Sequence, residues 1–223
     1  MEKVLYIIPT PIGNLEDITL RSIRLLKESD IVLAEDTRVT RKLFHHYDIK
    51  TKMISYHVFN EHQKIQKIIT IINQGLKVSL VSDAGTPSIS DPGFLLIREC
   101  IQHNINVISL PGPTACISAL VQSGLPSDKF NFEGFIPVKK GRKKVLSDIA
   151  TRKSTTIIYE SPHRILKTLK ELNEIINNRN IVVLKELTKI HESVFRGTIS
   201  DVINAISKSK IKGEFVIILD GGK

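Results

Sequence analysis

Three loops rich in glycine and proline hold the residue types from which a site for a small ligand can be built. They have the sequences PTPIGNL at 9–15, SDAGTPSISDPG at 82–93 and PGPTA at 111–115. Glycine and proline there fix unusual backbone paths and let a ligand approach the main chain closely. One such loop is more often structural than functional, but three in a short chain favour a composite site.

These loops lack the standard motifs for phosphate and metal binding. The chain has no GxxxxGK[ST], and no GxGxxG follows the first apolar run. HExxH and paired Cys/His spacings are absent, and Cys100 and Cys116 have no companions at ligand spacing. The pattern favours a nucleoside ligand held mainly by backbone atoms, and it predicts no metal site.

Charged residues at strand ends are candidates for acid–base or electrostatic roles. AEDTR at 34–38 places two carboxylates where a helix is expected to begin, so they either cap that helix or take part in chemistry. YESPHR at 159–164 and KELTK at 185–189 place further charges at strand ends. His163 in the first of these is more often a cap or a packing residue than a catalyst.

A run of cations follows the apolar turn GFIPV at 134–138. Its members are Lys139, Lys140, Arg142, Lys143 and Lys144. A charge run is usually a solvated face. Here the flanking phenylalanine, proline and glycines make an exposed phosphate-binding loop an equally good interpretation.

Short β-branched runs alternate with segments of helical period along the chain, which is typical of an α/β architecture. Strands are predicted at 4–8, 31–34, 77–81 and 106–110, and helices at 19–28, 37–47, 60–73 and 93–103, with Thr19 and Thr37 as N-caps. The second half has helices at 114–122, 163–176 and 200–207, and strands at 129–132, 155–159, 181–187 and 214–219.

The break Pro111-Gly112-Pro113 is the natural hinge between two domains, predicted at 1–112 and 113–223. All three glycine- and proline-rich loops follow predicted strands. They are therefore expected at strand carboxyl ends, where open α/β sheets place their ligands.

Composition points to an ordinary globular protein of 223 residues, with 41% apolar and 25% charged residues. No apolar run approaches the roughly 20 residues that cross a bilayer, and no signal peptide is recognisable. The two cysteines are expected to be buried free thiols, and a cytoplasmic location is predicted. The formal charge of +9 favours a polyanionic partner, although 22 lysines and 34 isoleucines also indicate an AT-rich codon bias.

Eight segments, in this order, resemble the ribosomal small subunit methyltransferase I family within the tetrapyrrole-methylase superfamily. They are TPIGNLEDIT (10–19), AEDTR (34–38), SDAGTPSISDPG (82–93), PGPTA (111–115), GFIPVKKGR (134–142), YESPHR (159–164), KELTK (185–189) and GEFVI (213–217). SDAGTPSISDPG and YESPHR separate this branch from relatives that methylate precorrins or diphthamide intermediates.

The resemblance implies two α/β domains of the tetrapyrrole-methylase type with S-adenosylmethionine in the cleft between them, and a homodimer. It implies 2′-O-methylation of a cytidine ribose in the decoding centre of 16S rRNA in the small ribosomal subunit. No membrane partner is expected, because no apolar run is long enough to cross a bilayer. By analogy, the donor contacts are Ile12, Asp83, Ala84, Gly85, Thr86, Ser88, Thr114, Ala115, Tyr159, Leu187 and Glu214.

A ribose hydroxyl is a weak nucleophile, so its methylation needs a base or cations that stabilise the alkoxide. Candidate bases are Asp36, Glu160 and Glu186, and candidate electrostatic helpers are Arg38, Lys140 and Arg164, all unranked. The cations at 139, 140 and 142–144 are expected to hold RNA phosphates, which gives affinity rather than base readout.

Two departures from the family pattern affect the expectation for RNA. Lys185 stands where the family commonly has arginine, which keeps the charge but loses the planar fork. Similar enzymes often continue past GEFVI into a small extra segment, so any RNA contact made there is expected to be missing.

Two other functions are alternatives. One is a tetrapyrrole C-methyltransferase, against which the YESPHR and KKGRKK segments argue. The other is a non-catalytic RNA-binding module, in which three loops at strand ends would have no purpose.

Overall fold

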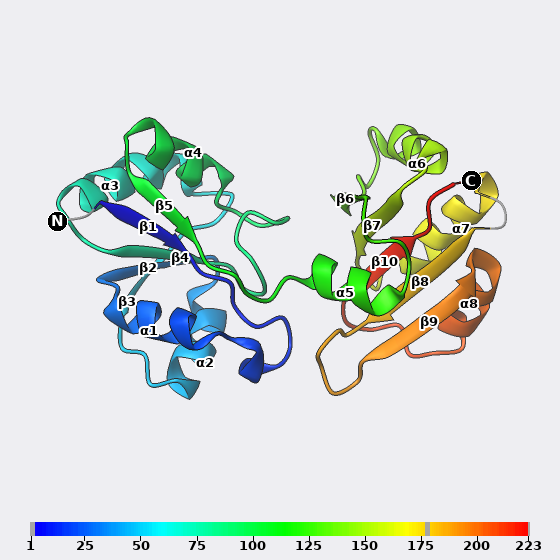
Figure 1. Ribbon diagram of the computed structural model, residues 1–223, viewed down its shortest axis with the longest axis horizontal. Helices are drawn as coiled ribbons and strands as arrows, with labels where there is room; N and C mark the ends of the chain where they lie inside the picture. Colours follow the sequence, from blue (N-terminus) through cyan, green and yellow to red (C-terminus); the bar gives the residue numbers. More distant parts are fainter. Residues whose placement is uncertain (1–2, 177–178, 223) are drawn as a thin grey trace. The chain divides into compact units, whose positions relative to one another are not determined.

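A computed structural model describes residues 3–176 and 179–222. The chain forms two compact units, unit 1 with Met1–Thr114 and unit 2 with Ala115–Lys223 (Figure 1). Each unit contains one five-stranded sheet.

Unit 1 is built on a parallel sheet with the strand order β3-β2-β4-β1-β5. Its strands are β1 (Val4–Ile7), β2 (Ile31–Ala34), β3 (Lys52–Ser55), β4 (Val78–Val81) and β5 (Asn106–Ser109). Its helices are the short η1 (Leu15–Asp17), α1 (Leu20–Glu28), α2 (Thr37–His46), α3 (Glu61–Asn73) and α4 (Phe94–Gln102). β2 and β4 are buried along their whole length, as expected for central strands of a parallel sheet.

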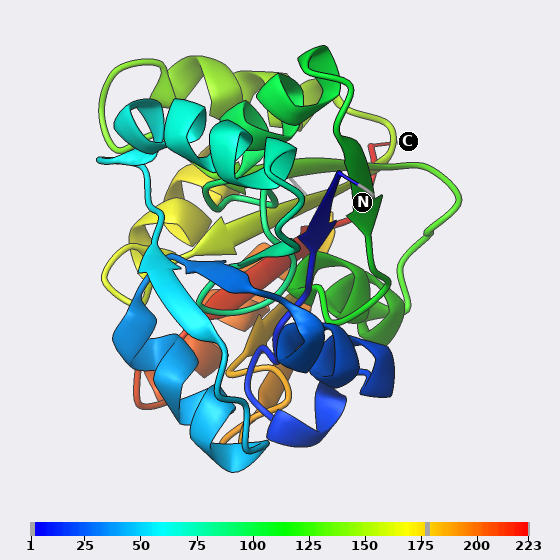
Figure 2. The ribbon, with the colours of Figure 1, turned by 90° about the vertical axis from the view of Figure 1, so that its left-hand side faces the viewer.

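The helices of unit 1 cover both faces of this sheet. α1 and α2 lie on one face and α3 and α4 on the other (Figure 2). Leu26 and Phe44 from the first pair contribute to one hydrophobic core, and Ile68 and Leu96 from the second pair contribute to the other. This layering leaves the strand ends open to loops, as in other open α/β sheets.

The helix starts in unit 1 follow ordinary capping chemistry. The Thr19 side chain accepts a hydrogen bond from Ser22 N at the start of α1, which confirms the predicted cap. Thr37, the predicted cap of α2, is instead its first helical residue. Asp36 is the cap, because its carboxylate accepts from Arg38 N at 2.8 Å.

Unit 2 has a mixed sheet with the strand order β6-β7-β10-β8-β9. Its strands are β6 (Phe130–Phe135), β7 (Thr155–Glu160), β8 (Asn180–Lys185), β9 (Ser193–Thr198) and β10 (Phe215–Leu219). Its helices are α5 (Ala115–Ser123), α6 (Arg142–Thr151), α7 (Ile165–Ile175) and α8 (Ile199–Ser207). α6, α7 and α8 share one core with the sheet, while α5 packs against β7 and β10.

Four elements of the described residues are not predicted from the sequence: the short η1, β3, α6 and β9. β3 and β9 are edge strands that each pair with a single neighbour. α6 begins at Arg142 after Gly141, which has a φ of +84°. The expectation of a cation loop extending to residue 144 is therefore corrected, because residues 142–144 form the first turn of a helix.

Among the described residues, His, Cys, Asp and Glu side chains form no cluster able to hold a metal ion. Cys100 and Cys116 are both free and buried, as predicted. Over residues 3–176 and 179–222, none of the helices combines the length and apolar character needed to span a membrane.

Candidate functional site

The three glycine- and proline-rich loops meet at one edge of the unit 1 sheet. They follow β1, β4 and β5, which lie side by side and run parallel. Since parallel strands end at the same edge, residues 9–15 and 82–93 and the part of the third loop in unit 1, residues 111–114, are brought to one place. β2 ends at this edge too and adds residues 35 and 36.

Direct hydrogen bonds join the first loop to the second. Thr10 and Gly85 exchange two backbone hydrogen bonds, each 2.9 Å long. The Thr10 hydroxyl also donates to the carbonyl of Ser82 at 3.0 Å. Gly85 has a φ of +82°, and a Cβ there would lie 3.3 Å from Ile12 Cγ2, so this close approach of backbone and side chain favours glycine.

The third loop is held against both of the others. The Thr86 hydroxyl donates to the Pro113 carbonyl at 3.0 Å and lies 2.6 Å from Thr114 Oγ1. A Cβ on Gly112 would come within 2.7 Å of the Pro9 Cβ. The three loops thus form one connected body rather than three independent connections.

The second loop carries backbone strain and an unpaired hydroxyl. Ser88 and Ser90 have φ values of 72° and 66°, in the left-handed region that non-glycine residues rarely adopt. Ser88 Oγ is buried and has no hydrogen-bond partner among the described residues. Strain and unsatisfied polar groups of this kind concentrate at ligand sites.

Asp36 and Arg38 form a tight ion pair at the end of β2. The guanidinium of Arg38 donates to both carboxylate oxygens of Asp36, with the shortest contact at 2.6 Å. These hydrogen bonds lower the pKa of Asp36 to about 2. A carboxylate that caps a helix, pairs with arginine and has so low a pKa is a poor proton acceptor at neutral pH.

Glu35, which the sequence patterns do not single out, lies in an environment that favours the protonated carboxyl, in contrast to that of Asp36. Burial raises its pKa, and the charge of nearby Asp83 raises it further. The Asp83 carboxylate accepts from Asp36 N at 2.9 Å, and burial followed by the charge of Asp36 raises the pKa of Asp83 as well. Raised carboxylate pKa values are typical of functional sites. The position of Glu35 in the AEDTR segment was the one signal available in the sequence.

A hollow of about 180 Å³ lies beside these groups in unit 1. Its lining comes from the first loop, α2 and the second loop: Thr10, Pro11, Leu15, Val39, Thr40, Lys42, Leu43, Ser82 and Asp83. Thr40 Oγ1 is buried there without a partner among the described residues. The hollow therefore offers an apolar wall together with a free hydroxyl and a carboxylate.

In unit 2, the segments predicted to bind the donor gather at one edge of the sheet. β10 runs antiparallel to both β7 and β8, and Phe215 at its start pairs with Glu160 and with Lys185. Tyr159, Leu187 and Glu214 therefore come from three neighbouring strand ends. The Tyr159 hydroxyl accepts from Cys116 N at 2.9 Å, and its ring packs edge-on against Phe132 and Phe135.

Glu186 and Glu214 share one cation at this edge. Lys189 Nζ lies 2.9 Å from Glu186 Oε1 and 2.9 Å from Glu214 Oε2. Burial opposes ionisation of Glu186, but hydrogen bonds from Lys189 and Glu214 N outweigh it, and the pKa of Glu186 is lowered. Gly213 has a φ of +85°, a conformation that favours glycine, and a Cβ there would displace the Glu186 carboxylate.

The comparisons with known proteins identify the family. Residues 4–203 match the family described as Tetrapyrrole (Corrin/Porphyrin) Methylases. The chain belongs to the tetrapyrrole methylase family. Solved structures of similar fold include a cobalt precorrin-4 methyltransferase, with a TM-score of 0.71 and 20% identity over 98% of this chain and 95% of that one.

Within the tetrapyrrole methylases, the chain belongs with the ribosomal RNA small subunit methyltransferases I. It is 46% identical to the protein of that name from Halalkalibacterium halodurans, over 97% of this chain and 75% of that protein. The Thermotoga maritima protein of the same name is 44% identical, over 97% of this chain and 98% of its own length. S-adenosylmethionine is the methyl donor of this family.

Glu160 of this tetrapyrrole methylase lies in a buried network. Its side chain accepts from Thr168 Oγ1 at 2.6 Å and from Ser161 N at 2.7 Å. Arg164 Nε lies 3.4 Å from it, and Arg164 also donates to the Ile136 carbonyl. Both residues thus hold the YESPHR turn in place, and Glu160, only 2% exposed, has little access to a substrate hydroxyl.

Arg142 lies in the same network, although it was expected among the RNA-binding cations. It is 5% exposed. Its guanidinium donates to Glu171 Oε2, to Thr168 Oγ1 at 2.8 Å and to the Pro137 carbonyl at 3.1 Å. With its donors directed inward, Arg142 fastens α6 to α7 instead of facing a phosphate. Lys139, Lys140, Lys143 and Lys144 are exposed.

Proposed function

We propose that this tetrapyrrole methylase transfers a methyl group from S-adenosylmethionine to the 2′-hydroxyl of a cytidine ribose in the decoding centre of 16S rRNA. The observation that carries the proposal is the joining of three strand-end loops into one body at the edge of the unit 1 sheet. Relatives named for small-subunit rRNA methylation, at 44–46% identity, support the choice of substrate.

The unit 1 loops fit a donor that has no phosphate. They offer backbone groups at close approach, the Asp83 carboxylate and the unpaired Ser88 hydroxyl. We assign to donor binding Ile12, Asp83, Ala84, Gly85, Thr86, Ser88 and Thr114. Ala115, Tyr159, Leu187 and Glu214 stay predictions from the family resemblance. When bound, S-adenosylmethionine supplies an activated methyl group on a sulfonium.

The main tasks of the protein are to align the substrate hydroxyl and to remove its proton. Of the predicted bases, Asp36 and Glu186 have lowered pKa values, and Glu160 is buried among hydrogen-bond donors. Glu35 combines a raised pKa with a place at the same sheet edge as the loops. We infer that Glu35 is the carboxylate in this group that is best suited to accept the proton.

The proposed activity can be tested by incubating the full chain with labelled S-adenosylmethionine and small ribosomal subunits from a strain that lacks this methyltransferase. Mapping the labelled nucleotide should place the methyl group on a cytidine ribose of the decoding centre. Labelling of a precorrin-type substrate in place of RNA would instead assign the chain to tetrapyrrole C-methylation. RNA binding without donor binding would make it a non-catalytic module.

We expect the exposed lysines around the start of α6 to bind RNA phosphates. Lys139 and Lys140 precede this helix, and Lys143 lies in its first turn, where unpaired backbone N–H groups also favour anions. Reversing these three charges should flatten the dependence of RNA affinity on salt by about one power for each phosphate that is no longer neutralised. Donor affinity should barely change.

The matched control reverses Lys208, Lys210 and Lys212, three exposed lysines elsewhere in unit 2. RNA affinity is measured against salt for both sets of substitutions. If both sets weaken binding equally, only non-specific charge is at work and the α6 lysines have no special role.

A homodimer is expected from the family resemblance. Light scattering at micromolar protein concentration should report a mass near twice the 25.1 kDa of one chain. A mass of one chain at every concentration tested would contradict this expectation.

A further inference from the structure

The outer face of α2 carries a stripe of basic residues outside the donor loops. Residues 37–52 contain five lysines or arginines and one acid, Asp48. Arg38, Arg41, Lys42 and His45 are all exposed and recur at the spacing that places residues on one helix face. We call these four residues the α2 stripe. Thr40, Leu43 and Phe44 on the other face are buried.

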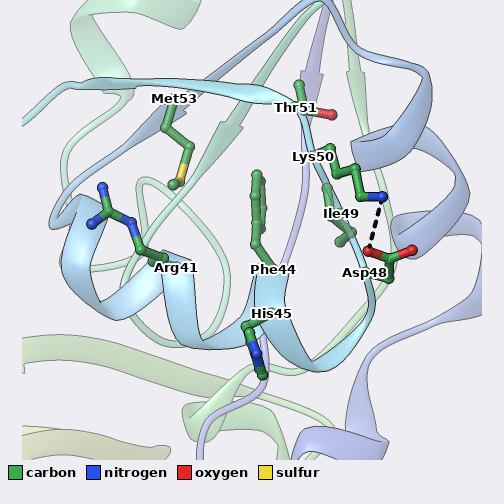
Figure 3. A pocket seen from close by; sticks show the side chains of 8 residues that line it. All are labelled: Arg41, Phe44, His45, Asp48, Ile49, Lys50, Thr51 and Met53. Carbon is green, nitrogen blue, oxygen red and sulfur yellow. Dashed lines mark ion pairs between the residues drawn. The ribbon is translucent and has the colours of Figure 1, made fainter.

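Two residues of the α2 stripe, Arg41 and His45, line a hollow of about 420 Å³ (Figure 3). Apolar groups of Phe44, Ile49 and Met53 line it, and Figure 3 shows the Phe44 ring standing between the other two. The polar lining residues are Arg41, His45, Asp48, Lys50 and Thr51. The volume lies within the range of about 300–1,000 Å³ that is usual for small-ligand pockets.

The cations around this hollow are available to an anionic partner. Lys50 is paired only loosely with Asp48, at 3.6 Å, and their side chains are 86% and 81% exposed. Such exposed pairs contribute little energy and exchange readily. Arg41 is exposed as well. An apolar interior beside a guanidinium and an ammonium suits a nucleotide, whose base packs on the apolar groups while its phosphate meets the cations.

The α2 stripe is also continuous with the candidate site in unit 1. α2 starts directly after Asp36, which is hydrogen-bonded to Asp83 of the second loop. At about 1.5 Å per helical residue, the seven steps from Arg38 to His45 cover about 10 Å. A strand of RNA that enters the site can therefore follow this helix.

We propose that the α2 stripe and its hollow bind the backbone of the substrate rRNA, with a nucleotide neighbouring the methylated one seated in the hollow. This inference rests on the proposed function. An amphipathic helix that inserts into a lipid surface needs a free apolar face. The apolar face of α2 is buried against the core of unit 1, so this surface does not suit a lipid.

The test compares two double charge reversals in the full chain. Arg41→Glu with Lys50→Glu alters the rim of the hollow, whereas Lys67→Glu with Lys77→Glu makes the same charge change at exposed lysines on α3 and directly before β4. We expect the first pair to weaken binding of 16S rRNA at least tenfold and to reduce the salt slope by about 2. The control pair should change the affinity less than threefold, and both should retain donor affinity.

Four readouts separate the possible outcomes. If the wild-type chain transfers no methyl group to small-subunit RNA, the proposed function fails whatever the variants do. If the wild type is active and both double variants bind RNA equally well, the inference about α2 is overturned while the function stands. RNA containing 4-thiouridine should cross-link to peptides within residues 39–53. A changed mass in light scattering with unchanged RNA affinity would assign this surface to a second copy of the chain and overturn the inference.

Discussion

Replacing Arg142 with alanine is expected to lower the free energy of unfolding by about 3 kcal/mol, the low end of the range for breaking a buried ion pair. The guanidinium is 5% exposed and bridges Glu171, Thr168 and the Pro137 carbonyl. Its removal leaves Glu171 only the weaker contact with Lys167 Nζ at 4.0 Å, and it leaves the Pro137 carbonyl without this donor. Glu171 is 29% exposed and can be rehydrated, which places the effect at the low end.

The neighbouring Lys143→Ala is the matched control, because Lys143 lies one position further along α6 and is exposed. Its effect should stay within about 0.5 kcal/mol, as is usual for surface substitutions. Urea unfolding measures both variants, and hydrogen exchange should locate the loss of stability in α6, α7 and β7. If the two variants are equally stable and weaken RNA binding equally, Arg142 belongs to the RNA-binding surface after all.

Arg142 also shows where sequence patterns stop being informative. In the sequence it is one of five similar cations in six positions, and its burial depends on Thr168 and Glu171, 26 and 29 residues away. The roles of Asp36 and Glu35 likewise depend on contacts that only the fold reveals. The sequence identifies two adjacent carboxylates, but only the fold shows that Arg38 neutralises one while burial and Asp83 raise the pKa of the other.

The elements that position the site were more predictable than these contacts. Parallel strands such as β2 and β4 are buried on both faces, so they appear as continuous apolar runs, and the loops that follow them must share an edge. The edge strands β3 and β9 carry mixed polarity and were missed. The strand predicted to reach residue 187 ends at Lys185, because Glu186 takes a φ of 54°.

Asp83→Ala is expected to weaken the binding of S-adenosylmethionine at least tenfold, which corresponds to about 1.4 kcal/mol. The Asp83 carboxylate accepts the Asp36 N–H at 2.9 Å and so ties the second loop to the end of β2. Alanine removes that acceptor and leaves a partly buried N–H unsatisfied, which costs about 1–3 kcal/mol. Gly85, Thr86 and Ser88 lie in the same loop, so a shift of residue 83 displaces the proposed donor contacts.

Two further variants separate the loss of the hydrogen bond to Asp36 N from the loss of the negative charge of Asp83. Asp83→Asn keeps an oxygen that can accept from Asp36 N, so its donor affinity should stay within about threefold of wild type. Asp17→Ala removes one negative charge from the exposed η1 segment that follows the first loop and should have no effect.

Calorimetry without added metal measures all three variants. If Asp83→Asn is as weak as Asp83→Ala, the negative charge itself acts on the donor, because both variants lose it while only one loses the acceptor. If Asp83→Ala binds like wild type, the second loop does not belong to the donor site.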